Sequence, residues 1–426
     1  MSVIALPEKA QAHYEQQIAL LAANTNLSVG WQQHSQQAWQ NFLQLGFPTR
    51  RQESWRYLDL TAFLKQAFSL TPLASELSVS PSLDAQHFLV ASYTIYCYNG
   101  QFLLDKTSKL PKGVAISSAI NNSVTVYESL LAKNPLDQLN QASAIEGIDL
   151  KIADNAIIDK PIHIVYLSNE TAAGKMLSLR SQWHIGKNSQ ASIMESFIGS
   201  GEVHYCQNIS TSIQLATGAR LIHYMLQQEG SLAFHFNQQV ISQQQDSVYH
   251  GHTYSLGGSL LRNEKTVLLE GSGAHCELSG VYHSALREQV ANHIRLQHEA
   301  AHTTSKTNYK GLADGQSKAI FNGSIYVKEN AQKINAQLSN KNLLLSANAA
   351  VNTKPELEIY ADDVQCAHGA NVGQLDENAL FFLQARGMAP TQARQMLIRA
   401  FAVDRLASIT DPAIRQLIEA QIDARI

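Results

Sequence analysis

A long stretch without proline constrains the fold of this chain more than any other feature. The 426 residues include ten prolines, but none falls between Pro161 and Pro355. Proline has no backbone N–H to donate to a sheet ladder, so a stretch without it is expected where most of the backbone lies in β-sheet. Apolar and polar residues alternate there, as at Ile162 and Ile164, and no strong helical period is present. The middle of the chain is therefore predicted to be mainly β.

Short polar breaks divide this β stretch at regular intervals. Each break ends in a small residue, and the breaks fall near the pairs 190–191, 218–219, 246–247, 273–274, 300–301 and 330–331. Regular breaks of this kind favour the stacked coils of a β-solenoid. A large sandwich or jelly roll with evenly spaced turns is the alternative, although such folds usually carry proline in their loops.

The N-terminal part of the chain has a different pattern. Residues 8–47 carry apolar side chains at helical spacing, and Gly46 followed by Pro48 is expected to end that helical segment. Residues 93–104 are typical of a β-hairpin that turns at the pair 99–100, Asn-Gly.

The C-terminal part is also predicted to be helical. The segment from Glu356 to His368 is expected to be the last strand, and the helical pattern begins beyond residue 373 with Asp376 as its N-cap. We therefore expect three regions: an N-terminal helical region (1–85), a β core (86–372) and a C-terminal helical region (373–426).

Charge and composition exclude several classes of function. The net charge is −3 and no run of Lys and Arg reaches five residues, so we expect no nucleic-acid partner. No run of 18 apolar residues is present, so we expect no membrane span. The first 17 residues lack the pattern of a signal peptide, and the four cysteines form no CxxC pair. These features favour a cytoplasmic protein without a disulfide framework or a zinc ribbon.

Known catalytic motifs are missing from the sequence. It contains no GxxxxGK[ST] loop for nucleotide phosphates, no GxSxG elbow and no HExxH pair. We therefore expect that the isolated chain hydrolyses no ATP and is not an enzyme.

Histidines are concentrated in the β stretch, where seven of the 16 lie between His250 and His302. His250 and His252 are two residues apart, hence on one face of a strand, where they could bind a metal. The interpretation we favour is a polar, solvent-facing side of the sheet. Cys206 and Cys276 lie in apolar strands, and we expect them to pack in the core.

Cys366 and His368 form a different pattern, Cys-Ala-His. In an extended chain the two side chains point the same way, and a thiolate with an imidazole suits iron and other soft metals. Two ligands do not complete a site, so a partner would have to supply the others.

Several segments of the sequence resemble one known family. The run from Lys354 reads Lys-Pro-Glu-Leu-Glu-Ile-Tyr-Ala-Asp-Asp-Val-Gln-Cys-Ala-His-Gly-Ala-Asn-Val-Gly-Gln-Leu-Asp, and Ala379 begins a second run, Ala-Leu-Phe-Phe-Leu-Gln-Ala-Arg-Gly. Both are similar to signatures of the SufB/SufD iron–sulfur cluster assembly family. SufB usually has His-Glu-Ala where this chain has His-Gly-Ala at His368, so the chain resembles the SufD branch, with Gly369 in place of the acidic residue.

The resemblance implies an architecture and a role. Its fold would be a right-handed parallel β-helix (solenoid) flanked by N- and C-terminal α-helical regions. The chain would be a non-catalytic scaffold subunit of a SufBCD complex, pairing with SufB through the β-helix and docking the ATPase SufC on its C-terminal helices. Cys366 and His368 would be candidate iron or cluster ligands at the SufB interface, shared with the partner.

The resemblance also implies transient cofactors and leaves other functions open. Iron or an iron–sulfur cluster would be held only in the complex, FAD and a part in iron acquisition are further implications, and the isolated chain would form a homodimer. The alternatives are a β-helix carbohydrate-active enzyme and a metal-dependent hydrolase that uses the histidine-rich strands. The adjacent acids Asp362 and Asp363 would point to opposite faces of a strand, which counts against the acid and base pair of a glycosidase.

Overall fold

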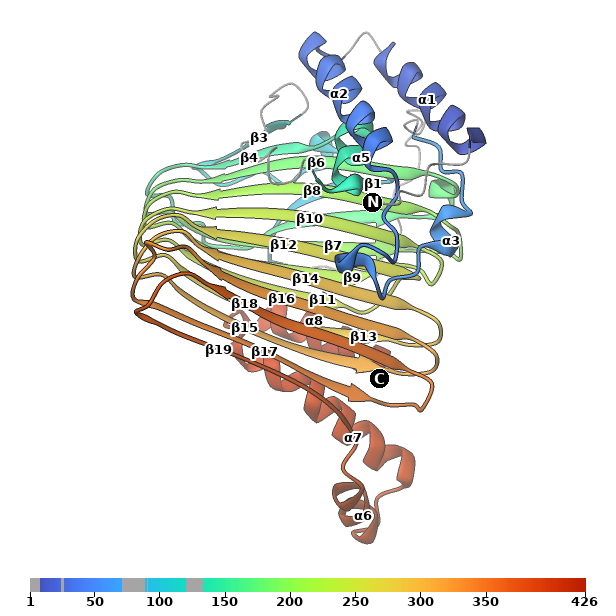
Figure 1. The fold of residues 1–426 in the computed structure, drawn as a ribbon, viewed down its shortest axis with the longest axis vertical. Helices are drawn as coiled ribbons and strands as arrows, with labels where there is room; N and C mark the ends of the chain where they lie inside the picture. The colour runs from blue at the N-terminus through green and yellow to red at the C-terminus, as the bar shows by residue number, and fades with distance from the viewer. Residues whose placement is uncertain (1–7, 24–26, 71–88, 90, 120–132) are drawn as a thin grey trace.

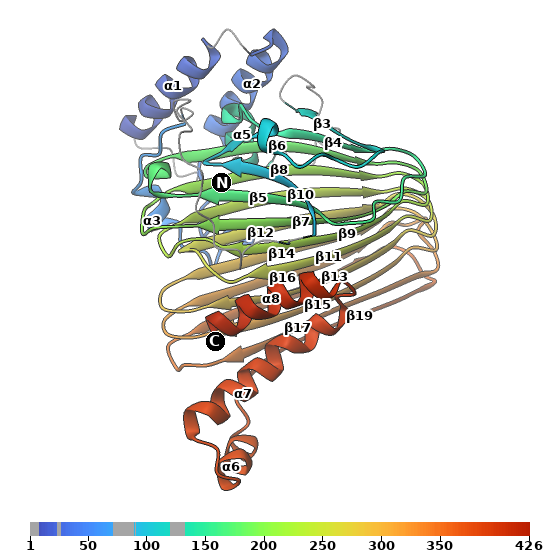
Figure 2. The same cartoon turned by 180° about the vertical axis from the view of Figure 1, so that it is seen from behind.

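A computed structural model describes residues 8–23, 27–70, 89, 91–119 and 133–426. Two long sheets lie face to face and form a flattened β-helix, with helices against their outer faces (Figures 1 and 2). From β4 onward the chain passes from one sheet to the other with each strand, and each strand pairs in parallel with the next strand of its own sheet. The predicted β-solenoid is therefore confirmed, and the sandwich and jelly roll are excluded because their sheets are antiparallel.

The first sheet has ten strands. In the order of the chain they are β1 (Tyr93–Tyr98), β2 (Gln101–Phe102), β5 (Ile162–Ser168), β7 (Gln190–Gly199), β9 (Arg220–Gln228), β11 (Val248–Ser255), β13 (His275–Ser284), β15 (Thr304–Ala313), β17 (Ile334–Leu344) and β19 (Val364–Gln374). The predicted hairpin is present as the antiparallel pair β1–β2, with positive φ at Asn99 and Gly100.

The second sheet has nine strands. They are β3 (Val114–Ser118), β4 (Ile148–Ile152), β6 (Met176–Ile185), β8 (Cys206–Leu215), β10 (Phe234–Gln243), β12 (Leu260–Leu269), β14 (Gln289–His298), β16 (Lys318–Val327) and β18 (Ala350–Ile359).

The predicted breaks lie at the corners that lead from the nine-stranded to the ten-stranded sheet. Left-handed backbone occurs at these corners at Asn188, Gly218, Asp246 and Gly273, whose φ values lie between 54° and 76°. Glycine, asparagine and aspartate tolerate this conformation best, whereas the next two corners have His302 and Lys333 in the same conformation. The interior between the sheets is filled by a single apolar cluster that runs from Ile95 to Ala361.

The N-terminal helices cover the outer face of the nine-stranded sheet. They are α1 (Glu8–Ala22), α2 (Val29–Leu45), the 3-10 turn η1 (Glu53–Trp55) and α3 (Thr61–Leu64), and Phe63 packs edge-on against Phe234 and Phe236. The prediction of one helical segment over 8–47 was wrong in part, because a break separates α1 from α2. Ser28 makes this break, since its hydroxyl accepts the Trp31 N–H as an N-cap; the predicted end at Gly46 is confirmed.

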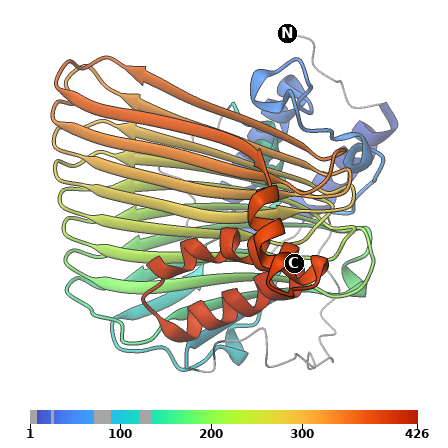
Figure 3. The same ribbon diagram turned by 90° about the horizontal axis from the view of Figure 1, so that it is seen from below.

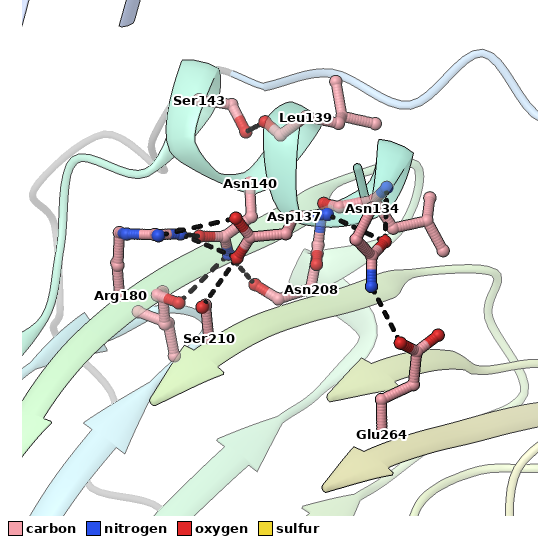
Figure 4. Close-up of polar contacts among 11 residues, drawn as sticks. Asn134, Asp137, Leu139, Asn140, Ser143, Arg180, Asn208, Ser210 and Glu264 are labelled. Atoms are coloured by element: carbon pink, nitrogen blue, oxygen red, sulfur yellow. Dashed lines mark hydrogen bonds and ion pairs between the residues drawn. The ribbon is translucent and has the colours of Figure 1, made fainter. Parts of the chain in front are cut away.

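Another helix, α5 (Pro135–Ser143), is bound to the same sheet face by polar contacts (Figure 4). Arg180 Nη1 lies 2.9 Å from Asp137 Oδ1, and the Ser210 hydroxyl donates to the same carboxylate oxygen at 2.8 Å. Asn140 donates to the backbone carbonyls of β6 and β8, and Asn208 donates back to the helix at 3.0 Å. The helix is thus held in one register on the sheet.

Two C-terminal helices, α7 (Pro390–Val403) and α8 (Pro412–Arg425), cover the outer face of the ten-stranded sheet (Figure 3). The helix α6 (Glu377–Ala385) precedes them, and the 3-10 turn η5 (Asp404–Ser408) lies before α8; shorter 3-10 turns are η3 (Leu104–Lys106) and η4 (Glu170–Ala172). The predicted N-cap is confirmed, because the Asp376 carboxylate accepts from two backbone N–H groups of α6. None of the described helices is long and apolar enough to cross a membrane.

The three-region division stays a prediction. The expected division near residue 85 falls among residues outside the described ranges, and the expected division at 372–373 falls near the end of β19. The N- and C-terminal helices both pack extensively on the β-helix, on opposite outer faces.

Candidate functional site

The last coil of the β-helix ends in two open strand edges. β18 and β19 are the terminal strands of their sheets, and neither has a further strand beside it in the described chain. The prediction of one continuous strand from Glu356 to His368 was wrong, because the chain turns a corner at residues 360–363 and passes between the sheets. Exposed edges of this kind are templates for pairing with another chain.

Cys366 and His368 both lie on β19 and face the interior side of this open coil. Their register partners on β17 are Ala336 and Leu338, which belong to the interior core, so the side chains of Cys366 and His368 project to the same side. Cys366 is half-buried and packs against that core, while His368 is exposed. Partial burial raises the pKa of the Cys366 thiol, so a metal ion or a partner's positive charge would be needed to favour the thiolate.

The described chain supplies no third ligand next to these two residues. Among the described residues, the one group of three His, Cys, Asp or Glu side chains with ligand atoms close together is His250, His275 and Glu277. That group lies on β11 and β13, so it does not include Cys366 or His368. The open-end pair would therefore be an incomplete metal site unless another chain contributes.

The two histidines that the sequence pattern paired share the outer face of β11, as predicted, but lie in different surroundings. His252 is buried, stacks on Tyr224 with ring centroids 4.8 Å apart, and shares a 2.7 Å hydrogen bond between its Nδ1 and Ser279 Oγ. Its expected solvent-facing position was therefore wrong. His250 is half-buried and faces His275 and Glu277 instead, two residues that the sequence pattern did not single out. Cys206 and Cys276 are buried, as expected.

A groove on the outer face of the nine-stranded sheet is rich in charged side chains, and two of its cations, Arg262 and Lys354, have partners within the chain. It lies between η1 and the nine-stranded sheet, where the Arg262 guanidinium stacks 3.6 Å above the Trp55 ring. Arg262 also donates to Glu264 at 2.6 Å, and Lys354 pairs with both Glu53 and Glu356. Since these cations already have partners, the groove joins the N-terminal region to the β-helix.

Comparison with known families assigns the chain. Residues 167–401 match the SufBD core domain of the SUF iron–sulfur cluster assembly system, and residues 7–164 match the SufBD protein N-terminal region. The chain belongs to the SufBD family. The resemblance found in the sequence is thereby confirmed, and the β-helix with Cys366 and His368 at its open end is the SufBD core of this chain.

Three relatives show how far the similarity extends. The iron–sulfur cluster assembly protein SufD of Escherichia coli (strain K12) is 27% identical over 99% of this chain and 98% of its own length. A SufBD family iron–sulfur cluster assembly protein of Synechocystis is 28% identical over 86% of this chain and 84% of its own. The chloroplastic protein ABCI7 of Arabidopsis thaliana is 26% identical over 93% of this chain and 86% of its own. The similarity to these proteins thus covers most of the chain, and the SufBD family acts in iron–sulfur cluster assembly.

Proposed function

We propose that this chain is a non-catalytic scaffold subunit that holds part of a nascent iron–sulfur cluster at a junction with a SufB partner. The observation that carries the proposal is the open last coil, where a half-buried thiol and an exposed imidazole project to one side of β19, a strand whose outer edge has no partner strand in the described chain. Pairing with a second β-helix would cover this edge and place the partner's ligands opposite Cys366 and His368. Iron or the cluster is the cargo of such a site.

The chemistry of the two side chains supports this role. Cysteine thiolates are the usual ligands of iron–sulfur clusters, and histidine replaces cysteine in some of them. Neighbouring strand positions cannot supply the same pair, because Gln365 and Ala367 project to the other side of β19. Binding of the metal would also remove the Cys366 proton, which offsets the effect of burial on its pKa.

The experiment compares cluster content in variants of the co-expressed complex. Cys366→Ala and His368→Ala should leave the β-helix and SufB pairing intact and lower the iron, sulfide and visible absorbance of the purified complex, with His368→Ala the more sensitive. Gln365→Ala is the matched control, since it changes the same strand on its opposite face. Wild-type cluster content in the double variant would refute the site, and loss of the complex would show that the two residues are structural.

We infer a second contact surface on α6, suited to the SufC ATPase. No residue of α6 is buried, the helix extends away from the β-helix (Figure 1), and Phe381 and Phe382 are 73% and 55% exposed. Two adjacent exposed phenylalanines on a helix that contributes no buried residue are typical of a protein-binding site.

Substitutions on α6 test this surface better than truncation. Removal of everything after Gly387 would uncover the apolar sheet face under α7 and α8, so aggregation would confuse the result. Phe381→Ser with Phe382→Ser should abolish SufC retention while the melting temperature stays unchanged. Ile157→Ser, at another exposed apolar position, should retain SufC. SufC retention by the double phenylalanine variant would contradict the docking surface.

The alternative functions are separable by simple measurements. A polyuronide activity screen tests the carbohydrate-active enzyme, for which Asp363 is a poor candidate because it is paired with Lys333. ATP or small-substrate turnover by the pure chain would contradict the scaffold role. Flavin binding, iron acquisition and a homodimer of the isolated chain stay predictions of the resemblance.

A further inference from the structure

Three metal-binding side chains meet on the outer face of the ten-stranded sheet. His250 of β11 is in register with Glu277 of β13, and His275 lies two residues before Glu277 on the same strand. Their neighbours Tyr249 and Cys276 belong to the interior core, so alternation turns all three side chains outward. One potential ligand atom from each lies within 4.8 Å of the other two, and all three side chains are half-buried.

A hydrogen bond holds one of the two imidazoles in place. His275 Nδ1 is 2.7 Å from the hydroxyl of Thr304, its register partner on β15. This contact fixes the ring and leaves Nε2 available, which is how metal-binding histidines are usually oriented by a neighbouring group. The His250 ring meets the His275 ring edge to face, with centroids 5.7 Å apart.

Ion pairs and hydrogen bonds within the described chain do not account for the position of Glu277 in this cluster. Glu277 forms no ion pair or side-chain hydrogen bond with another described residue, although Lys306 is its register partner on β15. A half-buried carboxylate beside two imidazoles without such a partner is costly unless a cation joins it. Each imidazole has a ring nitrogen that can bind a metal, and one potential ligand atom of each lies close to that of Glu277.

We propose that His250, His275 and Glu277 bind a divalent first-row transition metal ion. Two imidazoles and one carboxylate are the donor set of open zinc sites and of non-haem iron(II) sites, and three protein ligands leave room for water or a further ligand. The site is separate from the open end of the β-helix, because β15 and β17 lie between β13 and β19. It belongs to this chain alone, whereas the Cys366 and His368 site needs a partner.

Metal titration of the full-length isolated chain tests the site directly. After treatment with a chelator, Co(II) should bind in a 1:1 ratio with visible d–d bands, and Zn(II) or anaerobic Fe(II) should displace it. Glu277→Gln and His275→Asn should lose saturable Co(II) binding without a change in circular dichroism. His302→Asn is the control, since His302 is an exposed histidine on the same β-helix with a positive φ that asparagine tolerates.

Further variants test the ring orientation and the independence of this site from the open-end pair. Thr304→Val should weaken Co(II) affinity about 10-fold through loss of ring orientation, and Thr304→Ser should restore it. Cys366→Ala with His368→Ala should leave Co(II) binding unchanged even if it empties the cluster site. The proposal is overturned if the wild-type chain binds no stoichiometric metal, if Glu277→Gln binds as well as wild type, or if the Cys366 and His368 double variant abolishes binding.

Discussion

At the scale of single residues, the interior of the β-helix contains a few titratable side chains among its apolar ones. The Glu195 carboxylate accepts hydrogen bonds from Tyr166 at 3.0 Å and Gln239 at 3.2 Å, and it lies 2.9 Å from His223 Nε2. Burial lowers the pKa of His223, so the neutral ring donates to Glu195 through Nε2 and accepts from Tyr249 through Nδ1. These hydrogen bonds satisfy the Glu195 carboxylate, but none of them involves the buried cation that lies nearby.

Lys265 is that cation, and it provides a test based on pH. Its ammonium is buried without a hydrogen-bond partner among the described residues, and burial lowers its pKa from 10.5 to about 8. Between pH 8 and 10.5 the unfolded chain therefore binds more protons at this position, and the stability of the native state rises with pH. Lys265→Met should be more stable than wild type at pH 7, by on the order of 2 kcal/mol, and the difference should shrink by pH 10.

Urea denaturation of both proteins at pH 7, 8.5 and 10 measures this difference. The exposed Lys306 offers the matched control, since Lys306→Met should change stability little at any of these values. A constant difference between Lys265→Met and wild type across the range would contradict the lowered pKa.

The residue-level pattern of the metal cluster shows what sequence alone leaves open. The two-residue spacing of His275 and Glu277 is visible in the sequence, and so is that of His250 and His252. The side chains of β13 that lie beside His250 and His252 depend on the register between successive coils. That register is set by the length of each corner. The sequence therefore predicted that histidines share a strand face but not that His250 meets Glu277.

At the scale of elements, helix caps and tight turns were easier to predict than the points where a strand or a helix is interrupted. N-caps such as Asp376 and turns such as Asn99-Gly100 depend on neighbouring residues only, and both were predicted correctly. The corner at residues 360–363 carries neither glycine nor proline, and its two aspartates were interpreted as part of one strand, so the end of β18 was not predicted. The break between α1 and α2 has a signal, Ser28, but the apolar spacing continued across it.

The anchoring of α5 gives a prediction at this scale. Asp137 is fully buried and Arg180 nearly so, and Ser210 also donates to the carboxylate. Asp137→Ala would leave the guanidinium buried without its counter-ion, which costs roughly 3–5 kcal/mol in comparable sites. We expect a lower urea midpoint with an unchanged β signal, whereas Asp105→Ala, at an exposed acid, should match wild type. Equal midpoints for the two variants would show that α5 is held by apolar packing alone.

At the scale of the whole molecule, stacking similar coils produces both the stability and the open end. Each coil buries its apolar side chains against the next, and helices cover the outer faces, but the last coil has no further coil beside it in the described chain. The proline-free stretch and the recurring breaks were enough to predict the stack, because both follow from the repeated strand and corner. The position of α7 and α8 on the ten-stranded sheet was not predictable from their own apolar spacing.

The stack also buries histidines along its length, and this predicts how the molecule responds to acid. Burial lowers the pKa from 6.5 to about 3 for His163 and His252 and to about 4 for His283 and His298. Between pH 6.5 and 4 the unfolded chain is protonated at these positions and the native chain is not. Stability is therefore fully present above pH 6.5 and is lost as pH falls, by about 1.4 kcal/mol per pH unit for each such histidine.

A single substitution isolates one of these contributions. His298 accepts or donates through both ring nitrogens, at 2.8 Å to Thr303 and 2.9 Å to Ser305. His298→Gln should be less stable than wild type at pH 7, since these hydrogen bonds are disturbed, but its stability should fall less steeply toward pH 4.5. His34→Gln, at an exposed histidine of α2, should keep the wild-type slope. Chemical denaturation at half-unit steps of pH gives the slope of the free energy of unfolding against pH for each protein. Parallel curves for His298→Gln and wild type would contradict the prediction, because they would mean that the protonation of His298 is not linked to unfolding.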